Sequence, residues 1–173
     1  MKSLVFVAAL VMLGAAEPLG SIRYRAVTLD PGQRRMFRVN ELEKVTASSG
    51  LCVEEGMDID EPETFWLEAA CSGVRTTFAW KKGGTRVHVL ACAEDTKRTP
   101  TLVKLRQKLQ GELKTYKAMT ACVRAGRVEL WGWAMTAQER EFASGLGKRY
   151  GLDQVENHVE LLSEDELESS RGE

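Results

Sequence analysis

This sequence of 173 residues has few of the groupings that carry catalytic or metal chemistry. It has two histidines, His88 and His158, and each stands in a strand pattern without a nucleophile or metal-ligand companion nearby. No phosphate-cradling glycine loop and no G-x-S-x-G elbow occurs. The four cysteines form no C-x-x-C pair, so a zinc site or thioredoxin-like redox motif has little support. We therefore predict a protein that is not an enzyme and carries no cofactor or metal.

Long apolar runs are also scarce. The longest, Leu4–Leu13, follows the basic start at Lys2 and precedes small residues that end at Ala16. A membrane-spanning helix needs about 20 apolar residues, and this run is too short for one. Its flanks are typical of a secretory signal peptide. We predict a signal peptide over residues 1–16, followed by export to the periplasm.

Neither sign of charge is in excess. The chain holds 24 Lys and Arg against 25 Asp and Glu, for a formal net charge of −1. Removal of the signal peptide, whose one charged residue is Lys2, changes this only to −2. A near-neutral balance gives no overall attraction to nucleic acid, and we expect no nucleic-acid partner.

Cysteines are few, but their number is even, and in an exported chain this predicts disulfides. The four are Cys52, Cys71, Cys92 and Cys122. Three connectivities are possible. We favour Cys52–Cys71, because both lie on neighbouring strand patterns joined by an acidic loop. Cys92–Cys122 would then connect the first region of the chain to the second.

The first region, residues 17–93, has the pattern of an all-β structure. Short alternating segments recur along it, and turn signals such as Asp30-Pro31-Gly32 and Gly83-Gly84 separate them. Strands at this spacing favour a β-sandwich-like domain. Residues 94–98 then form a predicted linker to the second region.

The second region, residues 99–162, has an α-β-β-α-β order. Its expected helices and strands are Thr101–Lys114, Ala118–Val123, Val128–Met135, Ala137–Tyr150 and Val155–Leu161. Elements in this order pack as a small sheet with both helices on one face. The fold class predicted for the whole chain is thus a β plus α/β protein of two domains.

Local signals in the second region agree with this order. Thr136 and Glu139 form a T-x-x-E capping box at the start of the second helix. Gly151 stands where a helix C-cap is expected. Between the first two strands, Ala125 resists the positive φ of a two-residue turn. We therefore expect a three-residue loop with a bulge and with Gly126 in the left-handed conformation.

Two runs in this region resemble a BON domain: VRAGRVELWGW from Val123 to Trp133, and GLDQVENHVEL from Gly151 to Leu161. That family has a V-x-x-G-x-V-x-L-x-G strand pair, a helix and a V-x-N-x-x-x-V final strand. The resemblance covers roughly Thr99 to Leu162. It implies an envelope module that binds membranes or partner proteins, and it implies no catalysis.

The first region resembles the N-terminal domain of Tad-type pilus secretins. The resemblance rests on the runs LDPGQRR from Leu29, SGVRTTFAW from Ser72 and GTRVHV from Gly84. In those secretins a BON-like module and then an outer-membrane barrel follow this domain. Here residues 163–173 are polar and acidic, and we expect them to be a disordered tail. The resemblance therefore implies the periplasmic half of a secretin without its barrel.

The function implied by both resemblances is that of a structural or assembly component of a Tad-like pilus or secretin-based secretion system. Its partners would be secretin or pilus-assembly proteins, and a homo-oligomer is expected from the secretin resemblance. The alternative is a stand-alone BON envelope protein that binds anionic phospholipid. Whether a separate chain supplies the channel stays open.

Two groups of residues are candidates for contacts. Period-two alternation puts Trp131, Trp133 and Met135 on the sheet face opposite the helices, where either a partner or the first region covers them. The second group is basic and comprises Lys97, Arg98, Lys104, Arg106 and Lys108. It forms either a solvated helix face or a contact for anionic lipid or an acidic partner surface.

Overall fold

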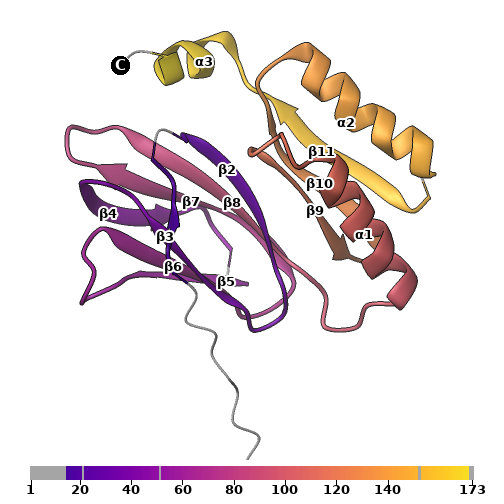
Figure 1. The fold of residues 1–173 in the computed structure, drawn as a ribbon, viewed down its shortest axis with the longest axis horizontal. Helices are drawn as coiled ribbons and strands as arrows, with labels where there is room; N and C mark the ends of the chain where they lie inside the picture. The colour runs from indigo at the N-terminus through magenta and orange to yellow at the C-terminus, as the bar shows by residue number, and fades with distance from the viewer. Residues whose placement is uncertain (1–14, 21, 51, 152, 172–173) are drawn as a thin grey trace, which may run out of the picture.

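The computed structural model describes residues 15–171 except 21, 51 and 152, so the predicted signal peptide lies almost wholly outside the described residues (Figure 1). Eight strands come first: β1 (Glu17–Pro18), β2 (Tyr24–Leu29), β3 (Arg34–Arg38), β4 (Leu42–Ala47), β5 (Val53–Met57), β6 (Thr64–Ala69), β7 (Gly73–Lys81) and β8 (Arg86–Ala93). The second half holds α1 (Pro100–Glu112), β9 (Met119–Arg124), β10 (Arg127–Ala134), α2 (Ala137–Tyr150), β11 (Val155–Leu161) and α3 (Glu164–Arg171). The chain is therefore rich in strands, with a few helices confined to its second half.

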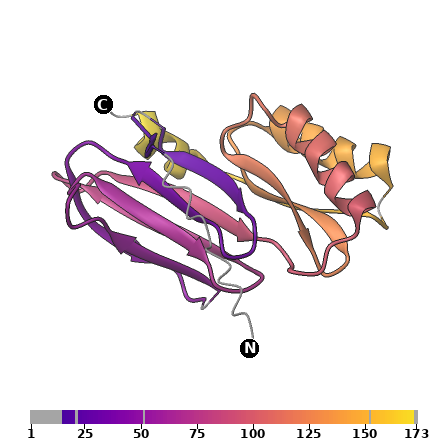
Figure 2. The same cartoon turned by 60° about the horizontal axis from the view of Figure 1, so that its bottom comes forward.

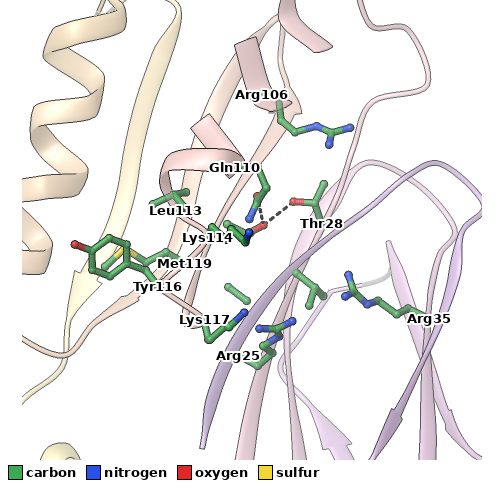
Figure 3. A pocket seen from close by; sticks show the side chains of 13 residues that line it. Arg25, Thr28, Arg35, Arg106, Gln110, Leu113, Lys114, Tyr116, Lys117 and Met119 are labelled. Atoms are coloured by element: carbon green, nitrogen blue, oxygen red, sulfur yellow. Dashed lines mark hydrogen bonds between the residues drawn. The ribbon is translucent and has the colours of Figure 1, made fainter. Parts of the chain in front are cut away.

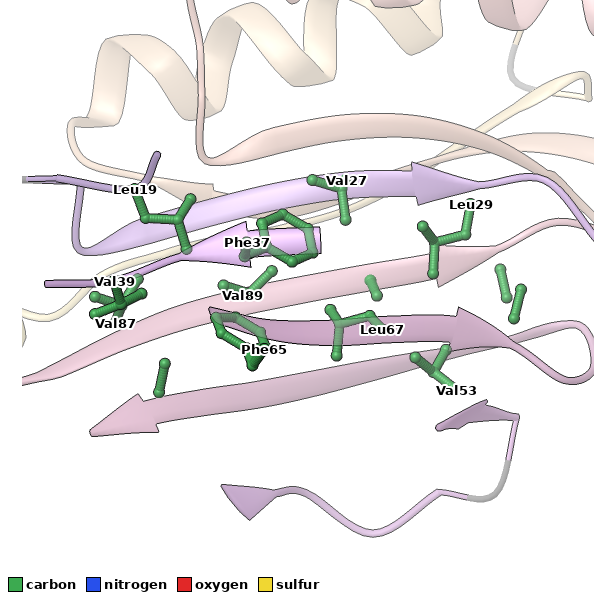
Figure 4. Packing of buried hydrophobic residues seen from close by; sticks show 14 of the residues in the cluster. Leu19, Val27, Leu29, Phe37, Val39, Val53, Phe65, Leu67, Val87 and Val89 are labelled. Atoms are coloured by element: carbon green, nitrogen blue, oxygen red, sulfur yellow. The ribbon is translucent and has the colours of Figure 1, made fainter. Parts of the chain in front are cut away.

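Strands β1 to β8 form two four-stranded sheets, ordered β1-β3-β6-β5 and β2-β8-β7-β4. Apolar side chains from both sheets fill the space between them (Figure 4). In β6, Phe65 and Leu67 are fully buried, whereas Trp66 and Glu68 are only half-buried on the outer face. Phe65 stacks on Phe37 of the paired strand β3, with ring centroids 5.2 Å apart. We call this β-sandwich the first unit.

A disulfide between Cys52 and Cys71 closes one end of the first unit, with the two Cα atoms 4.5 Å apart. It joins the start of β5 to the turn after β6, and the backbone N–H of Cys71 also donates to the Cys52 carbonyl at 3.1 Å. A Cβ atom on Gly73 would stand 2.6 Å from the Cys52 Cβ. The absence of a side chain at Gly73 therefore gives the disulfide its room.

The second unit, from α1 to β11, contains a three-stranded sheet in the order β11-β10-β9. β10 runs antiparallel to β9 and parallel to β11. Both helices pack on one face of this sheet and share a second hydrophobic core with it, which includes Leu109 of α1, Leu146 of α2 and Leu130 of β10. The α-β-β-α-β order and the position of both helices agree with the prediction from the sequence.

The capping signals of α2 act as the sequence predicts. The hydroxyl of Thr136 accepts from the Glu139 N–H at 3.2 Å, and the Glu139 carboxylate accepts from the Met135 N–H at 2.7 Å. Gly151 ends the helix with a φ of +93°. This conformation is open to glycine and strained for other residues.

The β9–β10 turn differs from the prediction. Arg124 pairs directly with Arg127, so the loop has two residues, and both Ala125 (φ +48°) and Gly126 (φ +74°) are left-handed. The expected three-residue loop with a bulge is wrong. A left-handed alanine costs roughly 1–2 kcal/mol. Because both faces of β9 are covered, a shift in register would expose several buried side chains, and this cost is greater.

The acidic end of the chain also differs from the prediction. Residues 163–173 were expected to be a disordered tail, but α3 forms over Glu164–Arg171. Ser163 and Glu166 make a reciprocal cap, in which the Ser163 N–H donates to the Glu166 carboxylate at 3.0 Å and the Ser163 hydroxyl accepts from the Glu166 N–H at 3.3 Å. Leu167 then packs against buried Tyr24 and Leu162. One apolar residue with a cap is enough to order this polar segment.

The two units lie side by side, with the sheet face opposite the helices turned toward β2 and β8 of the sandwich (Figures 1 and 2). α3 returns to the sandwich near the start of β2 (Figure 1). Within the described residues, no helix has the length and apolar character needed to cross a membrane.

Candidate anion-binding site at the junction of the two units

The tryptophans of β10 are packed inside the junction. Trp133 contacts Tyr24 at a ring-centroid distance of 5.3 Å and His88 at 6.1 Å, both in the first unit. Met135 joins the same cluster with Tyr24. Trp131 packs against the Cys92–Cys122 region and stays half-buried. Of the two arrangements that the sequence left open for this face, the one in the structure is coverage by the first unit.

His88 stands inside this aromatic cluster. Its ring lies 4.6 Å from that of Tyr24 and 5.0 Å from that of Phe78. Burial, together with the positive charge of Arg86, lowers the pKa of His88 from 6.5 to about 4, although Glu166 opposes the shift. The imidazole is therefore neutral at neutral pH and acts as an aromatic packing group.

A covalent bond and several hydrogen bonds fasten the junction. The disulfide Cys92–Cys122 joins β8 to β9, with the Cα atoms 6.3 Å apart. The Thr28 hydroxyl donates to the Ala121 carbonyl at 2.7 Å and lies 2.7 Å from the Thr120 hydroxyl. Both disulfides favoured from the sequence are thus present, and they indicate an oxidising compartment.

Glu94, in the predicted linker, is the most deeply buried charge of the junction. Its side chain is 0% exposed, and its Oε1 accepts from the Val123 N–H at 2.9 Å. Arg98 pairs with its Oε2, and the Nε of Arg106 lies 3.1 Å from its Oε1. Arg98 also donates to Asp30 at 2.6 Å, which is the largest cause of its raised pKa. A buried carboxylate needs partners of this kind, because isolation from water would otherwise be very costly.

The five predicted basic contact residues therefore do not form one free face. Arg98 and Arg106 turn inward to Glu94, whereas Lys97 and Lys104 are exposed. Lys108 lies with its Nζ 5.0 Å from the centre of the Tyr150 ring in α2. α1 thus contributes Lys104 to the surface and Arg106 to the interior of the junction.

A cavity of about 330 Å³ opens beside this network, between β2, β3, α1 and the segment that leads into β9 (Figure 3). Five basic side chains line it: Arg25, Arg35, Arg106, Lys114 and Lys117. No carboxylate or imidazole belongs to the described residues of the lining, which otherwise include Thr28, Gln110 and Tyr116. The cavity thus offers positive charge and hydrogen-bond donors.

One carboxylate reaches two of these cations from the side. Glu17 in β1 pairs with Arg25 through one oxygen and accepts from Arg35 through the other at 2.6 Å. The Nε of Arg25 is buried without a hydrogen-bond partner among the described residues. The carbonyl dipoles at the end of α1 oppose an anion, but the three positive charges that no carboxylate balances outweigh them.

No sequence pattern predicts this cavity. Arg25 and Arg35 lie in or beside strand patterns, where a charged residue is expected on the solvent-exposed face. Lys114 and Lys117 are expected at the solvated end of a helix. Only the contact between β2 and the second unit brings them together. Glu94 was missed for a similar reason, because a glutamate in a linker reads as solvent-exposed.

A second polar group lies on β10 and β11. Ligand atoms of Glu129, Glu156 and His158 all lie within 4.8 Å of one another, and the His158 ring stacks on Trp131 at 4.2 Å. The expectation that His158 has no metal-ligand companion nearby is therefore wrong, because the parallel register of β10 and β11 places these residues together. Arg124 and Arg127 already pair with the two carboxylates, which disfavours a cation there.

Comparison with known proteins finds no match for this chain among protein-family models, curated proteins or solved structures. The resemblance to a secretin N-terminal domain and to a BON domain therefore stays a prediction from the sequence. What the geometry shows is a β-sandwich joined by a disulfide to a three-stranded sheet with two helices, and a cationic cavity at the junction.

Proposed function

We propose that the chain is a structural or assembly component of a Tad-like pilus or secretin-based secretion system, which works in the periplasm through protein–protein contacts. The observation that carries this proposal is the joint, where Cys92–Cys122 and buried Glu94 hold the two units together. A fixed joint keeps the outer surfaces of both units in one relative orientation. Such rigidity suits a scaffold that must hold several partners in register.

The chemistry of the chain supports the compartment. Two disulfides require oxidising conditions, which the periplasm provides and the cytoplasm does not. The predicted signal peptide leads to the same place.

The test is recovery of partners from cell envelopes. Tagged protein, cross-linked in place and purified, should bring down secretin or pilus-assembly proteins. The double variant Cys92→Ser/Cys122→Ser should recover far less, because the outer surfaces lose their fixed orientation. Cys52→Ser/Cys71→Ser serves as the control, since it removes a disulfide within the first unit and leaves the joint bonded. Repeated recovery without any such protein contradicts the proposal.

The alternative is binding to anionic phospholipid, which the cationic cavity and the exposed Lys97 and Lys104 favour. Sedimentation with anionic and with neutral vesicles across a salt series separates the two functions. Electrostatic attachment weakens as salt rises, because exposed charges are screened beyond about 8–10 Å at physiological ionic strength. Binding that ignores both lipid charge and salt contradicts this alternative.

A further inference from the structure

We propose that the cavity between β2, β3, α1 and β9 is a binding site for a phosphate group, and that Glu17 is an internal carboxylate that competes for it. This inference does not depend on the assembly function, because it concerns what the joint itself holds. It rests on the charge of the lining and on the geometry of Glu17.

The charge of the cavity is not balanced from within. Arg98 and Arg106 are balanced by Glu94 and Asp30, whereas Arg25 and Arg35 share the single carboxylate of Glu17. For Lys114 and Lys117, both exposed, the described residues provide no ion pair. One unbalanced guanidinium charge and two ammonium groups around one space repel one another unless an anion enters.

Three of the cations are held firmly enough to form a site. The side chains of Arg25 and Arg106 are only 14% and 18% exposed, and that of Arg35 is 34% exposed. They come from β2, α1 and β3, so three separate elements fix their positions (Figure 3). Cations on separate rigid elements are already oriented before a ligand arrives, which reduces the entropy lost on binding.

Glu17 indicates which ligand the site accepts. Its two oxygens lie against the guanidinium groups of Arg25 and Arg35, so these two side chains already hold an oxyanion. A phosphate monoester presents further oxygens and a charge of about −1.5 to −2, against −1 for a carboxylate. The additional oxygens suit the flexible ammonium groups of Lys114 and Lys117.

Displacement of Glu17 requires little rearrangement. β1 is a strand of two residues, which pairs only with the edge of β3 through Glu17 and Phe37, and Pro18 and Arg38. Release of the Glu17 side chain frees both arginines without disturbing the core of the sandwich. Glu17 therefore occupies the site in the absence of phosphate and lowers its apparent affinity.

The experiment is a calorimetric titration of the full, oxidised protein with inorganic phosphate in a phosphate-free buffer of low ionic strength. Lys117→Gln should weaken binding roughly tenfold, because it removes one charge-assisted contact. Glu17→Ala should strengthen binding by about threefold or more, because the competitor is gone. Lys108→Gln removes the same charge from the far side of α1 and should leave the affinity unchanged.

Opposite effects at Glu17 and Lys117, with none at Lys108, distinguish a defined site from general attraction to a basic surface. Lys117 is exposed, so its variant keeps the fold, and an unchanged circular dichroism spectrum checks this. No detectable binding by the wild type and by Glu17→Ala overturns the proposal. So does equal weakening by Lys108→Gln and Lys117→Gln.

The phosphate group has two sources, a soluble phosphate compound or a lipid headgroup. Vesicles containing phosphatidylglycerol separate them. Sedimentation with these vesicles that inorganic phosphate reverses, and that Lys117→Gln weakens, assigns the site to lipid. Phosphate binding without sedimentation assigns it to a soluble ligand. Failure of envelope proteins to co-purify leaves both results unaffected, so the two proposals fail separately.

Discussion

Gly132 of β10 lies too close to a neighbouring backbone segment to accept a side chain. A Cβ atom there would lie 1.9 Å from the Ala118 carbonyl oxygen, and the backbone has a φ of +128°. The Trp133 N–H donates to the same carbonyl at 2.9 Å. The backbone thus approaches so closely that a side chain cannot be accommodated without loss of this contact.

We predict that Gly132→Ala lowers the free energy of unfolding by about 3 kcal/mol or more, through steric overlap and backbone strain together. Gly145→Ala in α2 is the matched control, because its Cβ meets no atom within 4 Å. That substitution should stabilise by about 0.5–1 kcal/mol, since alanine favours the helix. Urea denaturation measures both, and equal effects would contradict the packing at Gly132.

Glu94 shows what one buried charge contributes to the joint. Glu94→Ala leaves Arg98 and Arg106 without their shared carboxylate and the Val123 N–H without its acceptor. We predict a loss of about 3–5 kcal/mol in the free energy of unfolding. Asp30→Asn removes an exposed partner of Arg98, and its cost should stay below about 1 kcal/mol. Denaturant unfolding measures both losses. A loss in Glu94→Ala no larger than that in Asp30→Asn would refute the role assigned to Glu94.

At the scale of elements, the predicted bounds of helices and strands agree with the structure where the sequence patterns are strongest. α2 and β11 have the bounds that the capping box, the helical spacing and Gly151 predicted. The β9–β10 turn was predicted wrongly because tertiary contacts determine it, and α3 was missed although Ser163 and Glu166 form an S-x-x-E capping box in the sequence. The register of β9 requires a left-handed Ala125, and the packing of Leu167 orders a segment whose composition is that of a disordered tail.

α3 should depend on its N-terminal cap more than on the helix propensity of its other residues. We predict that Ser163→Ala destabilises the helix locally by about 1 kcal/mol. Amide hydrogen exchange over Glu164–Glu168 should then become several-fold faster, while exchange in the two cores stays the same. Glu168→Gln changes an exposed position of the same helix and is the control. Unchanged exchange in Ser163→Ala would show that contacts of α3 with the sandwich, and not its cap, hold the helix.

The cap also has a pH dependence. Hydrogen bonds from the backbone and hydroxyl of Ser163 lower the pKa of Glu166 below its usual 4.5. A depressed carboxyl pKa contributes stability that is present above 4.5 and is lost as the pH falls through the lower, folded value. Protection of the α3 amides should decline over that acidic range.

At the scale of the whole molecule, the joint was the least predictable part. The disulfide pairing and the two cores followed from cysteine positions and from residue periodicity. The cationic cavity did not, because its residues are separated by up to about ninety positions in the chain, and sequence patterns report only local structure.

The junction as a whole should weaken in mild acid. His88 has a pKa lowered to about 4 in the folded protein and near 6.5 when unfolded. Between these values the unfolded chain binds the additional proton, so stability falls as the pH drops from 6.5 to 4. Arg86, which opposes protonation, and Glu166, which favours it, both act on the ring. Because the ring is partly exposed, we expect a total loss of only about 1–2 kcal/mol.

His88→Phe keeps an aromatic ring beside Tyr24, Phe78 and Trp133 and removes the titrating group. Urea unfolding at pH 7, 5.5 and 4.5 should therefore give a smaller decline for this variant than for the wild type. The difference between the two isolates His88 from carboxyl groups that titrate in the same range. Parallel declines would show that His88 is not the source.

The order of the cysteines along the chain has a consequence for export. Each disulfide joins one cysteine to the next, Cys52 to Cys71 and Cys92 to Cys122. A chain threaded across a membrane from its N-terminus delivers each thiol just before its native mate. Oxidation in order of arrival therefore favours the native bonds over the two other pairings of four cysteines.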